Sequence, residues 1–188
     1  MTRIIMHGCN GRMGQVISEI VENDADARIV AGVDVYNEQK NDYPVYSSME
    51  ECRVEADVVI DFSNAQAVDD LLAYCEGKQL PVVLCTTGLS QEQMEHATAA
   101  SAKTAVLKSA NMSLGINTLM ELLQKAVKVL AGAGFDIEIV EKHHNQKLDA
   151  PSGTALALAD AMNEVMDDAY EYKYDRSQER KKRDKKEI

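Results

Sequence analysis

The first fourteen residues constrain the fold of this chain more strongly than any other stretch. Residues 3–7 have the apolar composition of a short buried strand, Gly8, Gly11 and Gly14 follow, and a helical pattern of apolar residues begins at Val16. A strand, a glycine turn and a helix in this order allow the backbone to approach a pyrophosphate without a Cβ in the way. The spacing is G-x-x-G-x-x-G rather than the commoner G-x-G-x-x-G, so a tight turn with incidental glycines remains an alternative at this point.

An acidic residue after the second predicted strand, residues 28–33, favours the dinucleotide interpretation. Asp34 lies about 20 residues after Gly14, where a carboxylate accepts hydrogen bonds from the adenosine ribose of NAD and repels an added 2′-phosphate. No arginine follows it to hold a phosphate, and only Lys40 is nearby. The sequence therefore predicts NADH rather than NADPH as the preferred cofactor.

Three further apolar strands are predicted at residues 56–62, 81–85 and 104–107. Small, polar or glycine residues follow each strand at its carboxyl end, which is the edge where ligands lie in an open parallel sheet. Ser90 and Gln93 have the spacing of a capping box and start a helix between the last two strands. The fold class is therefore α/β, with a Rossmann-type parallel sheet at the amino terminus.

The second half of the chain begins with a long helix, predicted over residues 115–131. Its apolar stripe, which we expect to be core throughout, consists of Leu119, Leu122, Leu123, Ala126, Val127 and Leu130. A strand is predicted at residues 135–140. Beyond Tyr174 the chain is polar, and the basic run of residues 176–186 is expected to be a solvated loop or tail, with contact to an anion as the alternative.

Chemically reactive side chains concentrate in the segment from Glu141 to Ala155. His143, His144 and Lys147 follow the predicted strand directly. A histidine titrates near neutral pH and can donate a proton, whereas a lysine can neutralise a carboxylate. A histidine pair alone would more often be a surface or metal-binding feature, but the lysine and the helix start that follows favour a site.

A helix start completes this segment. Pro151 suits the first turn of a helix, where its missing N–H is no loss. The free backbone N–H groups of Ser152, Gly153 and Thr154 are then expected to point out of the helix and to bind a carboxylate or a phosphate.

Composition excludes several classes of protein. The net charge of −11 argues against broad binding of nucleic acid, because a polyanion would be repelled. No stretch approaches the ~20 apolar residues of a membrane span, and no signal peptide is recognisable, so a cytoplasmic protein is expected. The four cysteines have no C-x-x-C spacing, so neither a zinc site nor a disulfide framework is predicted. Cys9 lies in the glycine loop, where a thiol can be acidified, but no catalytic partner is indicated.

Five motifs together resemble the dihydrodipicolinate reductase family. They are G-x-x-G-R-M-G at residues 8–14, D-F-S at 61–63, T-T-G at 86–88, S-A-N-M-S at 109–113 and E-K-H-H-N-Q-K-L-D-A-P-S-G-T-A at 141–155. The last motif is the most specific, and the resemblance covers the whole chain. It implies a two-domain enzyme of lysine and diaminopimelate biosynthesis, which reduces the cyclic dicarboxylate 4-hydroxy-tetrahydrodipicolinate (dihydrodipicolinate) to tetrahydrodipicolinate with NADH or NADPH.

The resemblance also implies domains and residue roles. Residues 1–114 would form the dinucleotide-binding Rossmann domain, and residues 115–188 part of an α+β domain for substrate binding and homotetramer formation. His143 is similar to the family's proton donor and Lys147 to its catalytic partner, whereas His144, Gly153 and Thr154 would hold the substrate carboxylates. Cofactor contacts would come from Gly8, Cys9, Asn10, Gly11, Arg12, Met13, Gly14, Asp34, Cys85, Thr86, Thr87, Ser109, Ala110, Asn111 and Met112.

Two departures from the family pattern keep an alternative open. Cys85 stands where the family usually has a glycine, and its larger side chain would lie beside the cofactor. Family members also continue beyond the point that corresponds to Ile188, with further strands of the substrate domain. A catalytically silent NAD-binding fragment is therefore the alternative to an active reductase. A different Rossmann-type dehydrogenase is disfavoured by the segment around His143.

Overall fold

The computed structural model describes residues 1–36, 41–145, 147 and 150–188. These residues form two compact units, Met1–Ser109 and Ala110–Ile188. The division expected between residues 114 and 115 falls just inside the second unit. Lys40 lies outside the described residues, so its expected position near the cofactor pocket stays a prediction.

The first unit is built on a six-stranded parallel sheet with the strand order β3-β2-β1-β4-β5-β6. Its strands are β1 (Thr2–His7), β2 (Ala27–Val33), β3 (Val45–Tyr46), β4 (Val58–Asp61), β5 (Val82–Leu84) and β6 (Val106–Lys108). The order reverses between β1 and β4, which makes their carboxyl ends the topological switch point of the sheet. The predicted α/β class with a Rossmann-type parallel sheet is confirmed.

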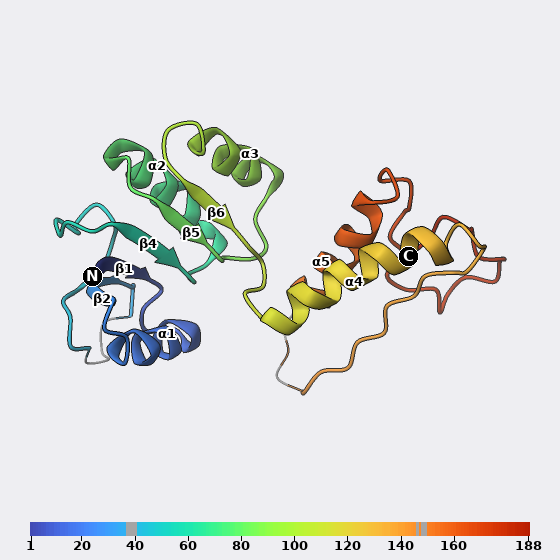
Figure 1. Cartoon of the computed structure of the whole chain (residues 1–188), viewed down its shortest axis with the longest axis horizontal. Helices are drawn as coiled ribbons and strands as arrows, with labels where there is room; N and C mark the ends of the chain where they lie inside the picture. Colours follow the sequence, from blue (N-terminus) through green and yellow to red (C-terminus); the bar gives the residue numbers. More distant parts are fainter. Residues whose placement is uncertain (37–40, 146, 148–149) are drawn as a thin grey trace. The chain divides into compact units, whose positions relative to one another are not determined.

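Helices connect these strands and cover the sheet (Figure 1). They are α1 (Arg12–Glu22), α2 (Val68–Lys78), which follows the short 3₁₀ helix η1 (Ala65–Ala67), and α3 (Gln91–Ala100). Because parallel crossovers are right-handed and the strand order runs outward from β1 in both directions, α1 covers the opposite face from α2 and α3. The Ser90 capping box at the start of α3 is confirmed, since Ser90 and Gln93 exchange both side-chain-to-backbone hydrogen bonds.

The hydrophobic core lies between the sheet and the α2–α3 layer. Strand residues with almost no exposure meet the buried faces of these helices, as in the cluster of Ile5, Val33, Val59, Val68, Leu71, Leu72, Val82, Leu84, Ala97 and Ala100. The other face is thinner, because α1 buries only Gly14 and leaves Val16 and Ile20 exposed.

The described residues of the second unit form two helices, α4 (Leu114–Leu130) and α5 (Gly153–Glu164), which pack against each other. The expectation that the whole apolar stripe of α4 is core was wrong. Val127 is buried, but Leu122 is 56% exposed, and Leu119 and Leu130 are also exposed. Burial of a full stripe needs a second layer, and among the described residues α5 covers only part of α4.

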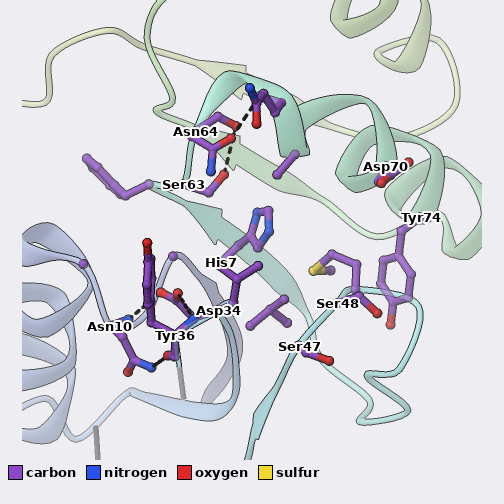
Figure 2. Close-up of a pocket in the computed structure, with 18 of the residues that line it drawn as sticks. His7, Asn10, Asp34, Tyr36, Ser47, Ser48, Ser63, Asn64, Asp70 and Tyr74 are labelled. Carbon is purple, nitrogen blue, oxygen red and sulfur yellow. Dashed lines mark hydrogen bonds between the residues drawn. The ribbon is translucent and has the colours of Figure 1, made fainter. Parts of the chain in front are cut away.

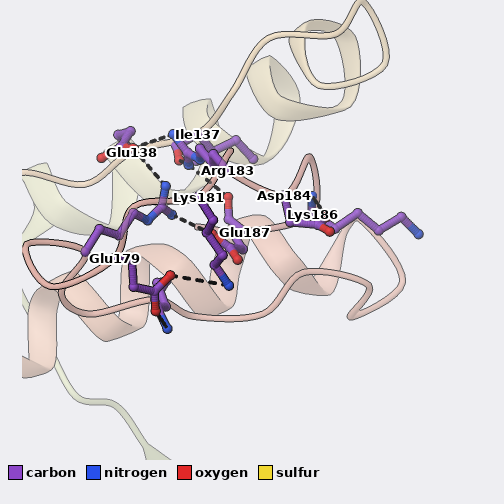
Figure 3. A network of polar contacts seen from close by, with 10 residues as sticks. Ile137, Glu138, Glu179, Lys181, Arg183, Asp184, Lys186 and Glu187 are labelled. Atoms are coloured by element: carbon purple, nitrogen blue, oxygen red, sulfur yellow. Dashed lines mark hydrogen bonds and ion pairs between the residues drawn. The ribbon is translucent and has the colours of Figure 1, made fainter.

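The strand predicted at residues 135–140 does not form in the described structure. The sequence of this stretch is typical of a strand, but a strand requires a neighbouring strand that completes its backbone hydrogen bonds. Side chains of the basic run contact it instead. Arg183 pairs with Glu138 and donates to the Ile137 carbonyl (Figure 3), and Lys185 pairs with Asp136 at 2.9 Å. The basic run is a loop, as expected, but it is partly neutralised by acidic side chains rather than fully solvated.

Candidate functional site

The glycine loop between β1 and α1 has a backbone that only glycine fits at two positions. Gly8 has φ +80°, and a Cβ there would lie 2.6 Å from the Phe62 carbonyl oxygen. A Cβ on Gly14 would lie 2.3 Å from the Gly8 oxygen. The predicted tight turn and the close packing of helix on strand are therefore both present. Two of the three glycines are required because a Cβ at either position would clash with the surrounding backbone.

The start of α1 is suited to a pyrophosphate. Its N-cap is Gly11, which supplies no side-chain cap, so the first-turn N–H groups at Arg12 and Met13 remain available for an anion. Next to them lies a pocket of about 790 Å³, within the range of small-molecule and cofactor sites. Gly8, Asn10, Gly11 and Asp34 line one side of it, as Figure 2 shows for the labelled residues. The free N–H groups at the start of α1 and the volume of the pocket fit a dinucleotide.

Asp34 is held at the end of β2 by the glycine loop itself. Its carboxylate accepts hydrogen bonds from the backbone N–H groups of Asn10, at 2.9 Å, and Tyr36, at 3.0 Å. The Asn10 side chain in turn donates to the Tyr36 carbonyl and accepts from Asn41. These contacts fix the direction of the carboxylate while its oxygens keep further lone pairs for a ligand.

The thiols near the site are not reactive nucleophiles. Cys9 is fully buried, and burial together with the negative charge of Asp34 raises its pKa to about 11. Burial and the charge of Asp34 therefore outweigh any lowering of the Cys9 pKa by the nearby helix start. Cys85 is also buried, and burial followed by the charge of Asp61 raises its pKa to about 11. The Cys85 side chain lies in the interior.

A buried polar network joins three strand ends of the first unit. Asp61, with 0% exposure, accepts hydrogen bonds from His7 Nδ1 at 2.8 Å, Ser63 Oγ at 2.6 Å and Thr86 Oγ1 at 2.6 Å. Burial alone raises the pKa of Asp61, but these hydrogen bonds outweigh it and place the pKa below its ordinary value. Thr86 thus uses its hydroxyl to fix the loop after β5, and Thr87 is the exposed threonine of the pair.

Sequence reasoning assigned no site role to His7 or Asp61. The available signal was a histidine and an aspartate as the last residues of two adjacent apolar strands, whose Cα atoms are paired in register. Buried polar side chains of this kind need hydrogen-bond partners, which only the three-dimensional arrangement reveals.

In the second unit, Glu141 organises the predicted catalytic segment. Its Oε2 lies 2.8 Å from His143 Nε2, and its Oε1 accepts the backbone N–H of Ser152 at 2.9 Å. The hydrogen bond from His143 comes first among the causes that lower the pKa of Glu141 to about 2, followed by the bond from Ser152. The sequence signal for Glu141 was its position two residues before His143, which in an extended segment places both side chains on one face.

The helix start after Pro151 differs in detail from the prediction. Ser152 is the N-cap of α5 and its hydroxyl accepts the N–H of Ala155 at 3.1 Å, so Pro151 precedes the helix rather than occupying its first turn. The N–H of Ser152 is taken by Glu141, which corrects the expectation that it is free. Gly153 and Thr154 are the first two helical residues, and their N–H groups have no partner within the helix.

The remaining predicted residues are divided between the two units. Ser109 ends the first unit with its N–H bonded to the Leu84 carbonyl at 3.1 Å, and Ala110 to Met112 begin the second. There, Asn111 Nδ2 donates to the hydroxyl of Thr154 at 3.1 Å. His144 and Lys147 are joined by a backbone hydrogen bond of 3.3 Å. The second unit thus brings Asn111 and Thr154 into direct contact.

Comparison with known proteins identifies the family. A sequence profile described as "Dihydrodipicolinate reductase, N-terminus" matches residues 2–112, and one described as "Dihydrodipicolinate reductase, C-terminus" matches residues 115–188. The chain belongs to the dihydrodipicolinate reductase family. The resemblance inferred from the motifs is confirmed.

Curated relatives of this family align with the whole chain. It is 50% identical over 188 residues to the 4-hydroxy-tetrahydrodipicolinate reductase of Caldanaerobacter subterraneus subsp. tengcongensis, covering 100% of this chain and 74% of that protein. It is 47% identical to that of Clostridium tetani, with 100% and 73% coverage. Both reductases are therefore longer than the aligned part.

A solved member of the family has the same fold. The structure of a dipicolinate-bound dihydrodipicolinate reductase from Paenisporosarcina sp. TG-14 superimposes with a TM-score of 0.71 at 26% identity, covering 96% of this chain and 71% of that one.

Among the described residues of the present chain, no helix is both long and apolar enough to cross a membrane.

Proposed function

We propose that this chain reduces 4-hydroxy-tetrahydrodipicolinate to tetrahydrodipicolinate with NADH or NADPH, in lysine and diaminopimelate biosynthesis. Membership of the family over the full chain supports the reaction. The observation that carries the mechanism is the pairing of His143 with Glu141 beside the start of α5. It places a proton donor beside first-turn N–H groups that can bind a carboxylate.

His143 is the proton donor in this proposal. The reduction takes up one hydride and one proton and releases water, and a reduced nicotinamide supplies the hydride. Glu141 is ionised and can only accept, so Nε2 of His143 carries a proton toward it. Nδ1 is then the ring nitrogen that gives its proton to the substrate. The negative charge of Glu141 also stabilises the imidazolium from which that proton leaves.

The substrate carboxylates are bound by the positive end of α5 and by two side chains. Gly153 and Thr154 offer first-turn N–H groups, and the dipole of α5 favours a negative charge there. Lys147 neutralises a carboxylate and supports the charge that develops on the ring, with His144 as a further donor. Thr154 is positioned for this by its hydrogen bond from Asn111.

The first unit binds the adenosine half of the cofactor, with the glycine loop on the pyrophosphate and Asp34 on the adenosine ribose. NADH is preferred, because the Asp34 carboxylate is fixed by Asn10 and Tyr36 where a 2′-phosphate would have to lie. Thr87 and residues 109–112 serve the nicotinamide side. A homotetramer and a cytoplasmic location complete the proposal by analogy with the family.

An assay coupled to the preceding synthase, which generates the substrate in place, tests this function. We expect NADH oxidation by the wild-type chain and a loss of about 10² to 10⁴ in rate in His143→Ala. His96→Ala, which removes a half-buried histidine that pairs with Asp69 and Glu76 in the first unit, is the matched control and should retain full activity. Equal rates in wild type and His143→Ala would remove His143 from its role.

A catalytically silent nucleotide-binding protein is the second candidate. The exposed apolar residues of α4 and the absence of a strand at residues 135–140 of the described structure favour it, because both belong to the substrate side. It predicts that NADH binds with no turnover under the same assay. Measurable turnover that disappears in His143→Ala excludes it.

A further inference from the structure

His7 is a buried histidine for which the proposed reaction has no use. It is the last residue of β1, is 6% exposed, and its Cα is paired with that of Asp61 at the end of β4. These two strands flank the point at which the strand order reverses. In sheets of this kind a dinucleotide crosses the carboxyl edge at that point, with one nucleotide on each half.

The hydrogen bonds of Asp61 determine which nitrogen of His7 carries a proton. Ser63 Oγ and Thr86 Oγ1 both donate to the carboxylate, and His7 Nδ1 lies 2.8 Å from Oδ1. An ionised carboxylate only accepts hydrogen bonds, so Nδ1 must donate. In the neutral imidazole Nε2 is then an acceptor with a free lone pair.

Nε2 is open to the pocket. His7 lines the 790 Å³ pocket together with Gly8, Asp34 and Ser63, and Figure 2 shows its imidazole among the labelled residues there. Among the described residues, the buried side-chain nitrogen and oxygen atoms without a partner are Thr104 Oγ1 and Arg183 Nε. Nε2 of His7 has no protein partner and is absent from that set, so solvent or a ligand reaches it.

We propose that His7 Nε2 accepts a hydrogen bond from a hydroxyl of the nicotinamide-side ribose of the bound dinucleotide, with Asp61 as the positioning residue that sets its tautomer. Asp34 at the β2 end takes the adenosine ribose, and the glycine loop takes the pyrophosphate. The second ribose therefore falls on the β4 side, where Nε2 is exposed. This inference rests on dinucleotide binding by the pocket, as the proposed function requires.

The chemistry of Nε2 selects a hydroxyl over a phosphate. A phosphate oxygen is an acceptor and would face the lone pair of a neutral imidazole, whereas a ribose hydroxyl donates. A purely structural role would need only Nδ1, which ties β1 to β4 through Asp61. Exposure of Nε2 to the pocket is the feature that a structural role leaves unexplained.

Titrations of the full chain with NADH and with ADP test the inference. ADP has the adenosine half and the two phosphates but lacks the second ribose. In His7→Asn the shorter amide can still donate to Asp61 but has nothing at the position of Nε2. We expect the Kd for NADH to rise about 2- to 12-fold, the range of one neutral hydrogen bond, and the Kd for ADP to stay unchanged.

The tautomer of wild-type His7 gives a second measurement that does not depend on how a variant folds. Two-bond ¹H–¹⁵N spectra should show a protonated Nδ1 and an unprotonated Nε2, with the Nε2 signal shifted by NADH and not by ADP. An Nε2–H tautomer, an Nε2 signal unmoved by NADH, or equal effects of His7→Asn on both ligands would overturn the inference. Failure of the wild-type chain to bind NADH at all would instead contradict the proposed function on which it rests.

Discussion

At the scale of single residues, the lowered pKa of Glu141 reflects its contacts with the proposed proton donor and with the start of α5. Its carboxylate holds both His143 and the N-cap of α5, and its pKa falls from an ordinary value of 4.5 to about 2. Because the folded-state pKa is depressed, the stabilisation it provides is fully present above pH 4.5 and is lost as the pH falls toward 2. We expect its carboxyl ¹³C signal to titrate with a midpoint of about 2.

Replacement of this charge tests the pairing. In Glu141→Gln the imidazolium of His143 loses its stabilising charge, so kcat should fall by about 10-fold or more, but by less than the ~10²- to 10⁴-fold loss expected for removal of the acid itself. The difference in the free energy of unfolding between wild type and Glu141→Gln should also shrink as the pH is lowered from 4.5 to 2. Glu95→Gln, on the exposed face of α3, is the control and should change neither quantity. An unchanged kcat in Glu141→Gln would show that His143 needs no such partner.

The sequence alone suggests a role for residues whose own chemistry and position in a motif indicate it, but not for residues whose role depends on a partner. Asp34 and His143 were singled out because their chemistry and their spacing from a motif are visible in one dimension. Glu141 and the His7–Asp61 pair acquire their roles through partners. For His7 and Asp61 those partners lie on neighbouring strands 54 residues apart, and no periodicity records such a distance.

At the scale of elements, the glycine loop tests how closely β1 and α1 approach. In Gly14→Ala the new Cβ would lie 2.3 Å from the Gly8 oxygen and 2.6 Å from the Cys9 oxygen, both backbone atoms that cannot rotate away. We expect the free energy of unfolding to fall by about 1–3 kcal/mol. Urea denaturation measures it.

A second glycine provides the control for this substitution. Gly77 lies in the last turn of α2, and a Cβ there meets nothing within 4 Å. Gly77→Ala should therefore stabilise the protein by roughly 0.5–1 kcal/mol through the lower entropy of its unfolded chain. Similar destabilisation by both substitutions would mean that the close approach at Gly14 is not what requires a glycine.

Helix α4 shows where an element could be predicted and its environment could not. The 3.6-residue pattern placed the helix correctly, because helical hydrogen bonds are local. Its burial depends on distant layers, and so does strand formation at residues 135–140, which needs a neighbouring backbone. The periodicity of apolar residues shows which face of a helix is apolar, but it does not show which other element covers that face.

A pair of substitutions on α4 separates these two environments. Val127→Ala removes two methyl groups from a site with 5% exposure and should cost about 1.5 kcal/mol or more. Leu122→Gln, at 56% exposure on the same helix, should change stability by no more than about 0.5 kcal/mol. Thermal denaturation of both variants measures this, and a larger cost at Leu122 would show that another part of the protein covers it in solution.

At the scale of the whole molecule, the division into Met1–Ser109 and Ala110–Ile188 makes a prediction about how a ligand stabilises the chain. The glycine loop, Asp34 and the pocket all belong to the first unit. A ligand that binds only the folded first unit stabilises it by about 2.7 kcal/mol at 100 times its Kd, whatever the second unit does. Hydrogen exchange of the buried amides of β1 and β4 should therefore slow about 100-fold with ADP at that concentration, because ADP carries only the groups proposed to bind the glycine loop and Asp34, and these amides exchange through opening of the unit that holds it. Exchange in α5 should be unchanged. Equal protection of α5 would show that the two units open as one cooperative structure, so that cofactor binding also stabilises the helix start on which the proposed substrate site depends.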